Sequence, residues 1–248
     1  MIALLWLEIK TMQWFIQLVN TINDSLWQAN CPLCKRPTEG ILCKDCDRQI
    51  TAYQSPNFLQ LDYPISPATP LYSWGIYDGA LKRAIAACKY NNHPEIMAAI
   101  ALKIAETWKR SPDAQLFKKS FPKSLVIPIP LHPNKLKSRG FNQAEILARH
   151  FCESVNLPCN SQLLQRIKDT KAQMQTKTKQ EREANLAKAF IISSNRLSSN
   201  RHSHQRDVIL FDDIYTTGAT IREAIATLAA SNMTVRGVIV LSRPQFKN

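Results

Sequence analysis

Apolar runs and amphipathic stretches alternate along the chain from residue 71 onward, and their order predicts the fold class. Short apolar runs typical of buried strands lie at 71–77, 125–131, 208–211 and 235–241, the first of them resembling an edge strand. Stretches with apolar residues on one helical face lie between them, at 80–90, 94–108, 140–149 and 221–230. Strands that alternate with helices pair in parallel, so we predict an α/β domain with a doubly wound, mostly parallel sheet.

The stretch around the third apolar run adds polar chemistry to this pattern. Asp212 and Asp213 follow the run directly, at the carboxyl end of a strand where open α/β sheets bind their ligands. A loop at the start of the next helix comes after them and consists of Thr216, Thr217, Gly218, Ala219 and Thr220. Unpaired N–H groups at a helix N-terminus favour an anion such as phosphate. The two carboxylates suit vicinal hydroxyls or a metal instead, so the stretch predicts a sugar-phosphate site.

This order of apolar strand, two acids and Thr-Thr-Gly-x-Thr resembles the phosphoribosyl-pyrophosphate (PRPP) fingerprint of type I phosphoribosyltransferases. The resemblance implies that Asp212 and Asp213 are the catalytic residues and hold the ribose hydroxyls. It also implies that residues 216–220 bind the 5-phosphate and that Mg²⁺ accompanies PRPP. Paired acids also follow apolar strands in the magnesium sites of receiver domains and NTPases. Those folds do not place this threonine loop directly behind the acids, so we favour the PRPP interpretation.

Two Cys-x-x-Cys pairs lie close together near the front of the chain, and they comprise Cys31, Cys34, Cys43 and Cys46. Each pair can form a tight turn that presents two thiolates to one ion, and four sulfurs complete a tetrahedron. Because all four positions are then filled, no open site remains for catalysis, and we predict structural Zn²⁺. Disulfides are the alternative, but a cytosolic setting disfavours them, and a redox pair would not require two matched motifs.

Length and composition predict how the chain is divided. Its 248 residues suffice for one α/β domain and a small module, and 45% hydrophobic residues argue against global disorder. We expect a helical extension over 1–30, the zinc module over 31–53, a linker over 54–70 and the phosphoribosyltransferase-like domain over 71–248. The apolar start lacks a basic region, and no run reaches the roughly 18 apolar residues that span a bilayer. We therefore expect a cytoplasmic protein without a transmembrane segment.

Positive charge dominates the composition. The 32 Lys and Arg residues exceed the 19 Asp and Glu residues, and the net charge of +13 favours polyanions such as nucleic acid or phosphorylated substrates. The alternative is a highly soluble protein with a phosphate pocket. Lys135, Lys137 and Arg139 follow the strand at 125–131 and suit a pyrophosphate, although a solvated basic face is the competing interpretation. The long, basic stretch 163–190 predicts a flap over the pocket.

Together these segments resemble the ComF family of competence-associated, phosphoribosyltransferase-like proteins over nearly the whole chain after Asn30. Besides the cysteines and the fingerprint, the matching residues are 77–79, 89–90, 128–133, 139–143, Arg166, Thr170, Gln173, Arg182, Asn185, Ala189 and Phe190. The segment 139–143, Arg-Gly-Phe-Asn-Gln, is especially specific, since ordinary nucleotide-salvage transferases lack it. The resemblance adds Lys89, Arg166 and Arg182 to the pyrophosphate and flap candidates. The chain departs from the family between Gln173 and Arg182, where a Thr/Lys-rich run replaces the usual Leu-Ser pair.

The resemblance implies a role in DNA uptake during natural transformation, on incoming single-stranded DNA and with a helicase-type partner. As an enzyme, the protein would transfer a phosphoribosyl group from PRPP, but no segment indicates a purine, pyrimidine or ammonia acceptor site. The alternative is a catalytically silent nucleic-acid or helicase-partner binding module that retains only the fold. The net charge of +13 supports this alternative. The sequence lacks an obvious aromatic and basic stacking platform, which weakens direct single-strand recognition.

Overall fold

The structure is a computed structural model that describes residues 29–60, 65, 69–168, 188–193 and 206–245. Nearly all of the predicted extension over 1–30 lies outside these residues, as do most of the predicted flap and Arg182 within it. In the described part of the chain, no helix is both long enough and apolar enough to cross a membrane.

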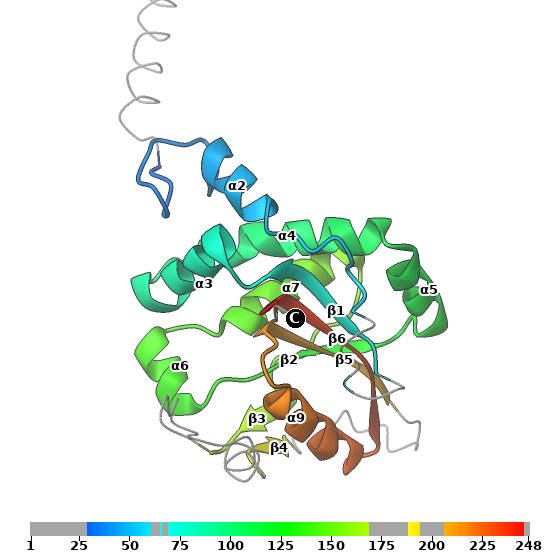
Figure 1. Ribbon diagram of the computed structural model, residues 1–248. Coiled ribbons are helices and arrows are strands. Elements are labelled where there is room, and N and C mark those ends of the chain that lie inside the picture. Colours follow the sequence, from blue (N-terminus) through cyan, green and yellow to red (C-terminus); the bar gives the residue numbers. More distant parts are fainter. Residues whose placement is uncertain (1–28, 61–64, 66–68, 169–187, 194–205, 246–248) are drawn as a thin grey trace, which may run out of the picture.

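Four parallel strands form the central sheet (Figure 1). In order across the sheet they are β1 (Leu71–Ile76), β6 (Met233–Arg243), β5 (Arg206–Ile214) and β2 (Leu125–Pro128). Every pairing is parallel, and β1 is an edge strand, as the sequence predicts. The predicted strand at 125–131 ends early at Pro128, because proline cannot continue a ladder of backbone hydrogen bonds. Strands β5 and β6 are longer than the apolar runs 208–211 and 235–241 that predict them.

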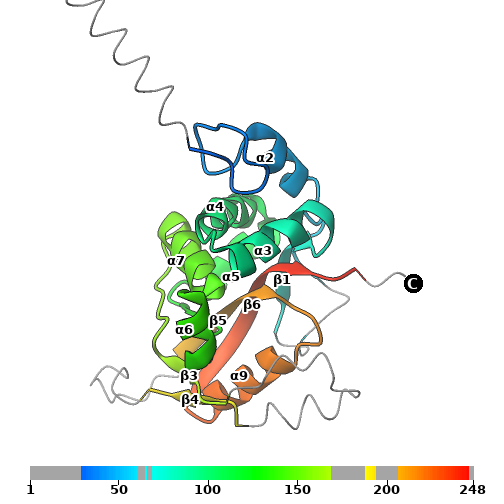
Figure 2. The ribbon, with the colours of Figure 1, turned by 90° about the vertical axis from the view of Figure 1, so that its left-hand side faces the viewer.

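Side chains of successive strand residues point to opposite faces of the sheet, so each face has its own core. On one face Trp74 and Phe211 pack with α3 (Gly79–Asn91), α4 (Glu95–Arg110) and α7 (Gln143–Val155). On the other face Val208 and Leu210 pack with α9 (Ala219–Ala229) and with a hairpin of β3 (Leu164–Arg166) and β4 (Phe190–Ile192). Figure 2 shows the helices on the two sides of the sheet. The predicted doubly wound α/β class is therefore confirmed.

In the main domain, two helices that the hydrophobic pattern does not predict are short and depend on local capping. They are α5 (Pro112–Ser120) and α6 (Pro133–Arg139), and each begins with a proline, which is favourable at the first helical position. The Ser111 hydroxyl accepts a hydrogen bond from an amide in the first turn of α5, and the His132 ring does the same for α6. Such helices bury few side chains, so apolar periodicity alone does not reveal them.

The cysteine module lies above the first helices of the main domain, at the top of Figure 1. Its helix α2 (Lys44–Thr51) packs against α3 and buries Ile50 completely in the main core. Lys103 on α4 forms an ion pair of 2.8 Å with Asp47. Residues 54–60, within the predicted linker, run along β1, where the Ser55 amide donates to the Trp74 carbonyl. The module is thus fixed to the main domain by apolar contacts and by backbone hydrogen bonds.

Candidate functional site

The two acids of the fingerprint lie within β5, which continues past them to Ile214. Their side chains point to opposite faces of the sheet, because neighbouring residues in a strand alternate. Asp213 shares the face of Phe211, towards α3 and α7, and is 5% exposed. Asp212 shares the face of Leu210, towards α9, and keeps part of its surface exposed. Adjacent carboxylates therefore face different surroundings.

Asp213 is held by side chains from two distant helices. The Lys89 ammonium, at the end of α3, forms an ion pair with the Asp213 carboxylate. The Gln143 amide, at the start of α7, donates to the same carboxylate oxygen at 3.2 Å. Arg139 in turn donates to the Gln143 carbonyl oxygen at 2.6 Å. A continuous chain of polar contacts thus runs from Arg139 through Gln143 and Asp213 to Lys89.

Helix caps explain how the Arg-Gly-Phe-Asn-Gln segment reaches this position. Gly140 ends α6 in a left-handed conformation with φ 84°, which glycine adopts without strain. Asn142 then caps α7 by accepting from the Ala144 amide at 3.1 Å, while its own amide donates to the Ile129 carbonyl at 3.0 Å. The turn between the two helices therefore presents both Arg139 and Gln143 to the carboxyl edge of the sheet.

The electrostatic environment differs sharply between the two acids. Burial, followed by the neighbouring Asp213 charge, raises the pKa of Asp212 well above its ordinary value of 3.8. Burial would lower the pKa of the Lys89 ammonium, but the Asp213 carboxylate outweighs burial and raises this pKa. Burial also raises the pKa of the Cys88 thiol, next to Lys89 in α3, to about 12, so this thiol is protonated and unreactive. Asp213 is thus neutralised by a cation, whereas Asp212 is protonated more readily than an ordinary aspartate.

The threonine loop leads from β5 into α9. Gly218 caps α9 with φ 74°, and a Cβ added there would lie 2.4 Å from the Tyr215 hydroxyl. Arg222 donates to the Thr217 carbonyl at 2.9 Å and holds the loop from the first turn of the helix. Thr216 and Thr217 are exposed. The loop therefore offers hydroxyl groups and a helix N-terminus to a ligand, as expected of a phosphate site.

The other predicted cations are placed differently. Lys135 and Lys137 lie on α6, which ends at Arg139, and Lys137 is exposed. Arg166 lies in β3, with its guanidinium 5.7 Å from the centre of the Phe190 ring. Among the predicted cations, Lys89 and Arg139 take part in the polar chain that ends at Asp213. Gln143 is the site residue missing from the predicted set, although it closes the Arg-Gly-Phe-Asn-Gln segment.

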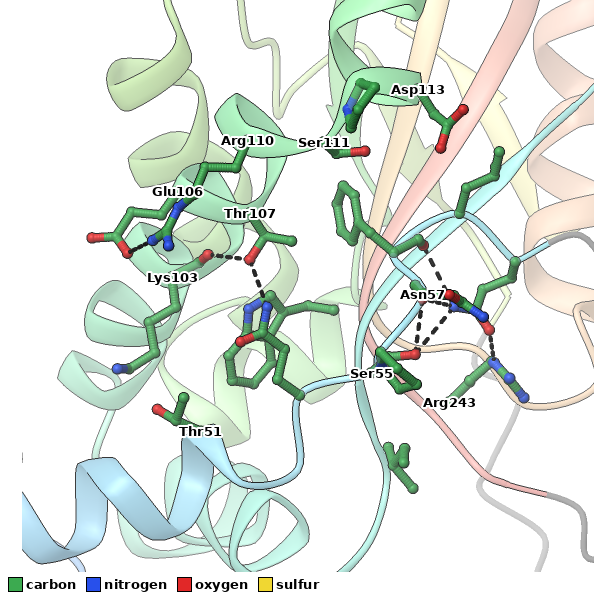
Figure 3. A pocket seen from close by; sticks show the side chains of 18 of the residues that line it. Thr51, Ser55, Asn57, Lys103, Glu106, Thr107, Arg110, Ser111, Asp113 and Arg243 are labelled. Atoms are coloured by element: carbon green, nitrogen blue, oxygen red, sulfur yellow. Dashed lines mark hydrogen bonds and ion pairs between the residues drawn. The ribbon is translucent and has the colours of Figure 1, made fainter.

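A separate cavity of about 1050 Å³ lies between α4 and the segment 54–60 (Figure 3). Lys103, Glu106 and Thr107 line one side of this cavity. Ser55 and Arg243 line the other side, where Arg243 donates to the Gln60 side chain at 2.6 Å. None of the lining residues comes from the acids or the threonine loop, so this cavity is distinct from the predicted sugar-phosphate site.

The four cysteines of the front module converge on one point. Their sulfur atoms all lie within 4.8 Å of one another, and Cys34 and Cys43 are 3.5 Å apart. Sulfur atoms bound tetrahedrally to a zinc ion would be separated by about 3.8 Å, so the arrangement fits a four-coordinate metal ion. The Arg36 amide, and then its guanidinium, lower the pKa of the Cys34 thiol to about 6. Metal ligands must be deprotonated, so these donors favour the metal-binding form of Cys34, whereas burial and the neighbouring thiols raise the pKa of Cys46.

Comparison with known proteins confirms the predicted resemblance to the ComF family. The chain is 28% identical over 200 residues to competence protein ComFC of Bacillus subtilis, covering 80% of this chain and 70% of that protein. It is 34% identical over 98 residues to competence protein F of Haemophilus influenzae, covering 40% and 41% of the two chains. The DNA utilization protein YhgH of Escherichia coli K12 is 27% identical over 207 residues, with 82% and 84% covered. No family model matches the chain.

Among solved structures, the chain is similar to adenine phosphoribosyltransferases from two Leishmania species. For the enzyme of Leishmania donovani the TM-score is 0.35 at 11% identity, with 73% of both chains covered. For the enzyme of Leishmania tarentolae the TM-score is 0.35 at 12% identity, with 74% of this chain and 94% of the other covered.

Proposed function

We propose that this relative of the ComF proteins binds the phosphoribosyl group of PRPP, together with Mg²⁺, at the carboxyl edge of its sheet. The observation that carries the proposal is the continuous path from β5, through Asp212 and the threonine loop, into the N-terminus of α9. This path combines an oxygen ligand for hydroxyls or a metal with donors for a phosphate, and a sugar phosphate requires both.

The two acids would have different tasks in this site. Asp212 faces α9, on the side of the threonine loop, and is our candidate for contact with the ribose hydroxyls. Asp213 is engaged by Lys89 and Gln143, so it would hold the edge of the sheet in place and contribute to the local field. The 5-phosphate would bind to residues 216–220, whose hydroxyls and amide groups start the helix.

The cations on the opposite side of the site would receive the pyrophosphate. Arg139 is oriented by Gln143, and Lys135 and Lys137 precede it by four and two residues on α6. Mg²⁺ bound to PRPP would neutralise further negative charge on the pyrophosphate oxygens. Stabilisation of a leaving anion by preorganised charges is a general source of rate acceleration, and it would support phosphoribosyl transfer here. Arg166 and Arg182 remain candidates for the flap.

For the front module we propose structural Zn²⁺ bound by the four cysteines. The ligand set consists entirely of thiolates, which suits zinc, and it leaves no open coordination position. The fixed contacts of α2 with α3 and α4 indicate that the ion would stabilise the junction between the module and the main domain.

The names of the relatives give the biological setting. Two are competence proteins and a third is a DNA utilization protein, so we propose that this protein acts in DNA uptake during transformation. Single-stranded DNA and a helicase-type competence protein would be its partners. A binding module without catalysis is the second candidate, and the net charge of +13 favours it.

Calorimetric titration of PRPP and Mg²⁺ into the metal-loaded full chain tests the proposed site. Wild-type protein should bind PRPP, and Asp212→Asn should abolish or strongly weaken binding because it removes the charged ligand of the ribose or metal. Asp113→Asn, which alters an exposed acid on α5, is the matched control and should bind normally. If the folded wild-type protein releases no heat, the phosphoribosyl proposal is wrong and the binding-module candidate remains.

A further inference from the structure

A groove separates the cysteine module from α3, on the side of α3 that does not face the sheet. Its volume is about 460 Å³, which lies within the range of ligand-binding clefts. On α3 the lining residues recur at helical spacing and include Arg83, the small Ala86 and Ala87, and Tyr90. The small residues leave room between α3 and the module.

Arginine side chains of both parts of the chain face this groove. Arg36 lines it from the module and Arg83 lines it from α3. Arg83 also reaches across to Gln49 of α2, with its guanidinium 3.4 Å from the amide oxygen. Asp45 is shared by Arg36 and Arg48, and Arg36 also donates to the Sγ atom of Cys34, which lines the groove together with Cys46. The residues that line the groove in the described chain include no carboxylate.

An exposed aromatic ring completes the groove. Tyr90 is 78% exposed at the end of α3, so its ring contributes little to the core. An uncovered aromatic ring beside cations is the combination with which proteins bind unpaired bases, because each base has a flat face that can stack. This combination cannot be recognised from the sequence, because Arg36 and Tyr90 come from separate segments that meet only in the folded protein.

We propose that this groove binds single-stranded nucleic acid, with a base stacked on Tyr90 and the neighbouring phosphates bound by Arg36 and Arg83. A duplex fits this arrangement poorly, because its bases are stacked on one another and cannot reach a single ring. The assignment deepens the proposed role in DNA uptake and rests on it for the choice of strand. It does not depend on PRPP binding, because none of the groove residues is part of the phosphoribosyl site.

The position of Tyr90 brings the groove close to that site. Lys89 and Tyr90 are neighbours in α3, yet Lys89 reaches inward to Asp213 while Tyr90 lies at the exposed groove. Residues one apart on a helix point in directions about 100° apart, so one helix end can serve two different sites. A strand in the groove would therefore pass close to the end of α3 that anchors Asp213.

Fluorescence anisotropy with a labelled oligothymidylate and the metal-loaded full chain tests the proposal. Tyr90→Ala should weaken binding about tenfold or more, because stacking of one base is lost, whereas Tyr90→Phe should retain binding. Arg83→Gln should weaken binding and flatten the dependence of log affinity on log salt by about 0.7. Arg110→Gln is the matched control, because it removes one exposed positive charge on α4, outside the groove, and should have little effect.

Several results would overturn the assignment. The groove is not the binding site if Tyr90→Ala binds the oligonucleotide as the wild-type protein does, or if Arg110→Gln weakens binding as much as Arg83→Gln. Absence of oligonucleotide binding by the wild-type protein would also refute it, as would a preference for the duplex. Calorimetry with PRPP separates the two proposals: Tyr90→Ala should bind PRPP normally, and Asp212→Asn should bind the oligonucleotide normally.

Discussion

The cysteine module and the Asp212–Asp213 edge are both small polar centres, but they are built from different sequence distances. The four cysteines come from two adjacent turns, and their sulfur atoms converge within 4.8 Å. Asp213 instead depends on Gln143, 70 residues away, and on Lys89 from a third element. A locally built centre needs only its ligands and an ion, whereas the other needs the complete sheet and two helices. The comparison indicates that the module will respond to metal removal and the acid edge to changes in core packing.

The largest effect should follow from breaking the metal centre. Replacing Cys31 and Cys34 with serine should abolish metal binding and unfold the module, because bound zinc contributes on the order of 10 kcal/mol to the folding of small zinc domains. Limited proteolysis should then cut within 29–53 while the parallel sheet stays intact, and elemental analysis should find no metal. Cys159→Ser, which alters an exposed cysteine outside the module, should keep the metal.

The next largest effect should follow from removing the cation beside Asp213. Lys89→Met leaves a buried carboxylate without its partner, and the free energy of unfolding should fall by about 3–5 kcal/mol in urea titration. Lys103→Met breaks the more exposed ion pair with Asp47 and should cost about 1 kcal/mol or less. A second change, Asp213→Asn, should restore part of the stability lost in Lys89→Met. Equal losses for the two lysines would contradict the distinct role of Asp213.

A smaller effect is expected at the loop between the acids and α9. Gly218→Ala should cost about 1–2 kcal/mol in unfolding free energy, because φ 74° is unfavourable for alanine. The new Cβ also meets the Tyr215 hydroxyl, so the loop should shift and PRPP affinity should fall. Gly40→Ala in the module is the matched control, since a Cβ there meets nothing closer than 3.6 Å. Thermal unfolding and calorimetry of both variants decide whether the loop needs this conformation.

The most gradual effect concerns pH. The folded protein raises the pKa of Asp212 above 3.8, so ionisation of Asp212 costs stability as pH rises from 3.8 through the raised pKa. Asp212→Asn removes this cost. The unfolding free energy of Asp212→Asn minus that of the wild type should therefore increase from pH 3.8 up to the raised pKa of Asp212. Above that pKa the difference should stay constant. A constant difference at all pH values would show that folding does not raise the pKa of Asp212.

The sequence predicts the centre built from neighbouring residues better than the centre built from distant ones. The Cys-x-x-Cys spacing predicts the cluster of four cysteines because these residues are close in sequence. The apolar run before Asp212 identifies β5 because a buried parallel strand is apolar on both faces. The pairing of Lys89 with Asp213, and the part of Gln143, depend on how α3 and α7 pack on the sheet. No local pattern contains that information. The helices α5 and α6 are not predicted from apolar periodicity, because N-caps and prolines, rather than an apolar face, set where they form.

The groove beside Tyr90 gives the same lesson in another form. The sequence shows no run of aromatic and basic residues, yet folding brings Arg36 of the module next to Arg83 and Tyr90 of α3. The expectation that the chain lacks a stacking platform holds for the sequence alone. In the folded protein, a candidate platform exists where the module meets the main domain.

The central claim is that two adjacent acids have separate tasks, Asp212 as the ligand and Asp213 as the anchor. The most direct test is the PRPP affinity of Asp212→Asn measured on protein whose unfolding free energy has been determined in the same buffer. We predict that Asp212→Asn is at least as stable as the wild type at neutral pH and has lost PRPP binding. A variant that binds PRPP as tightly as the wild type, or that loses binding only because it is unfolded, would contradict this division of roles.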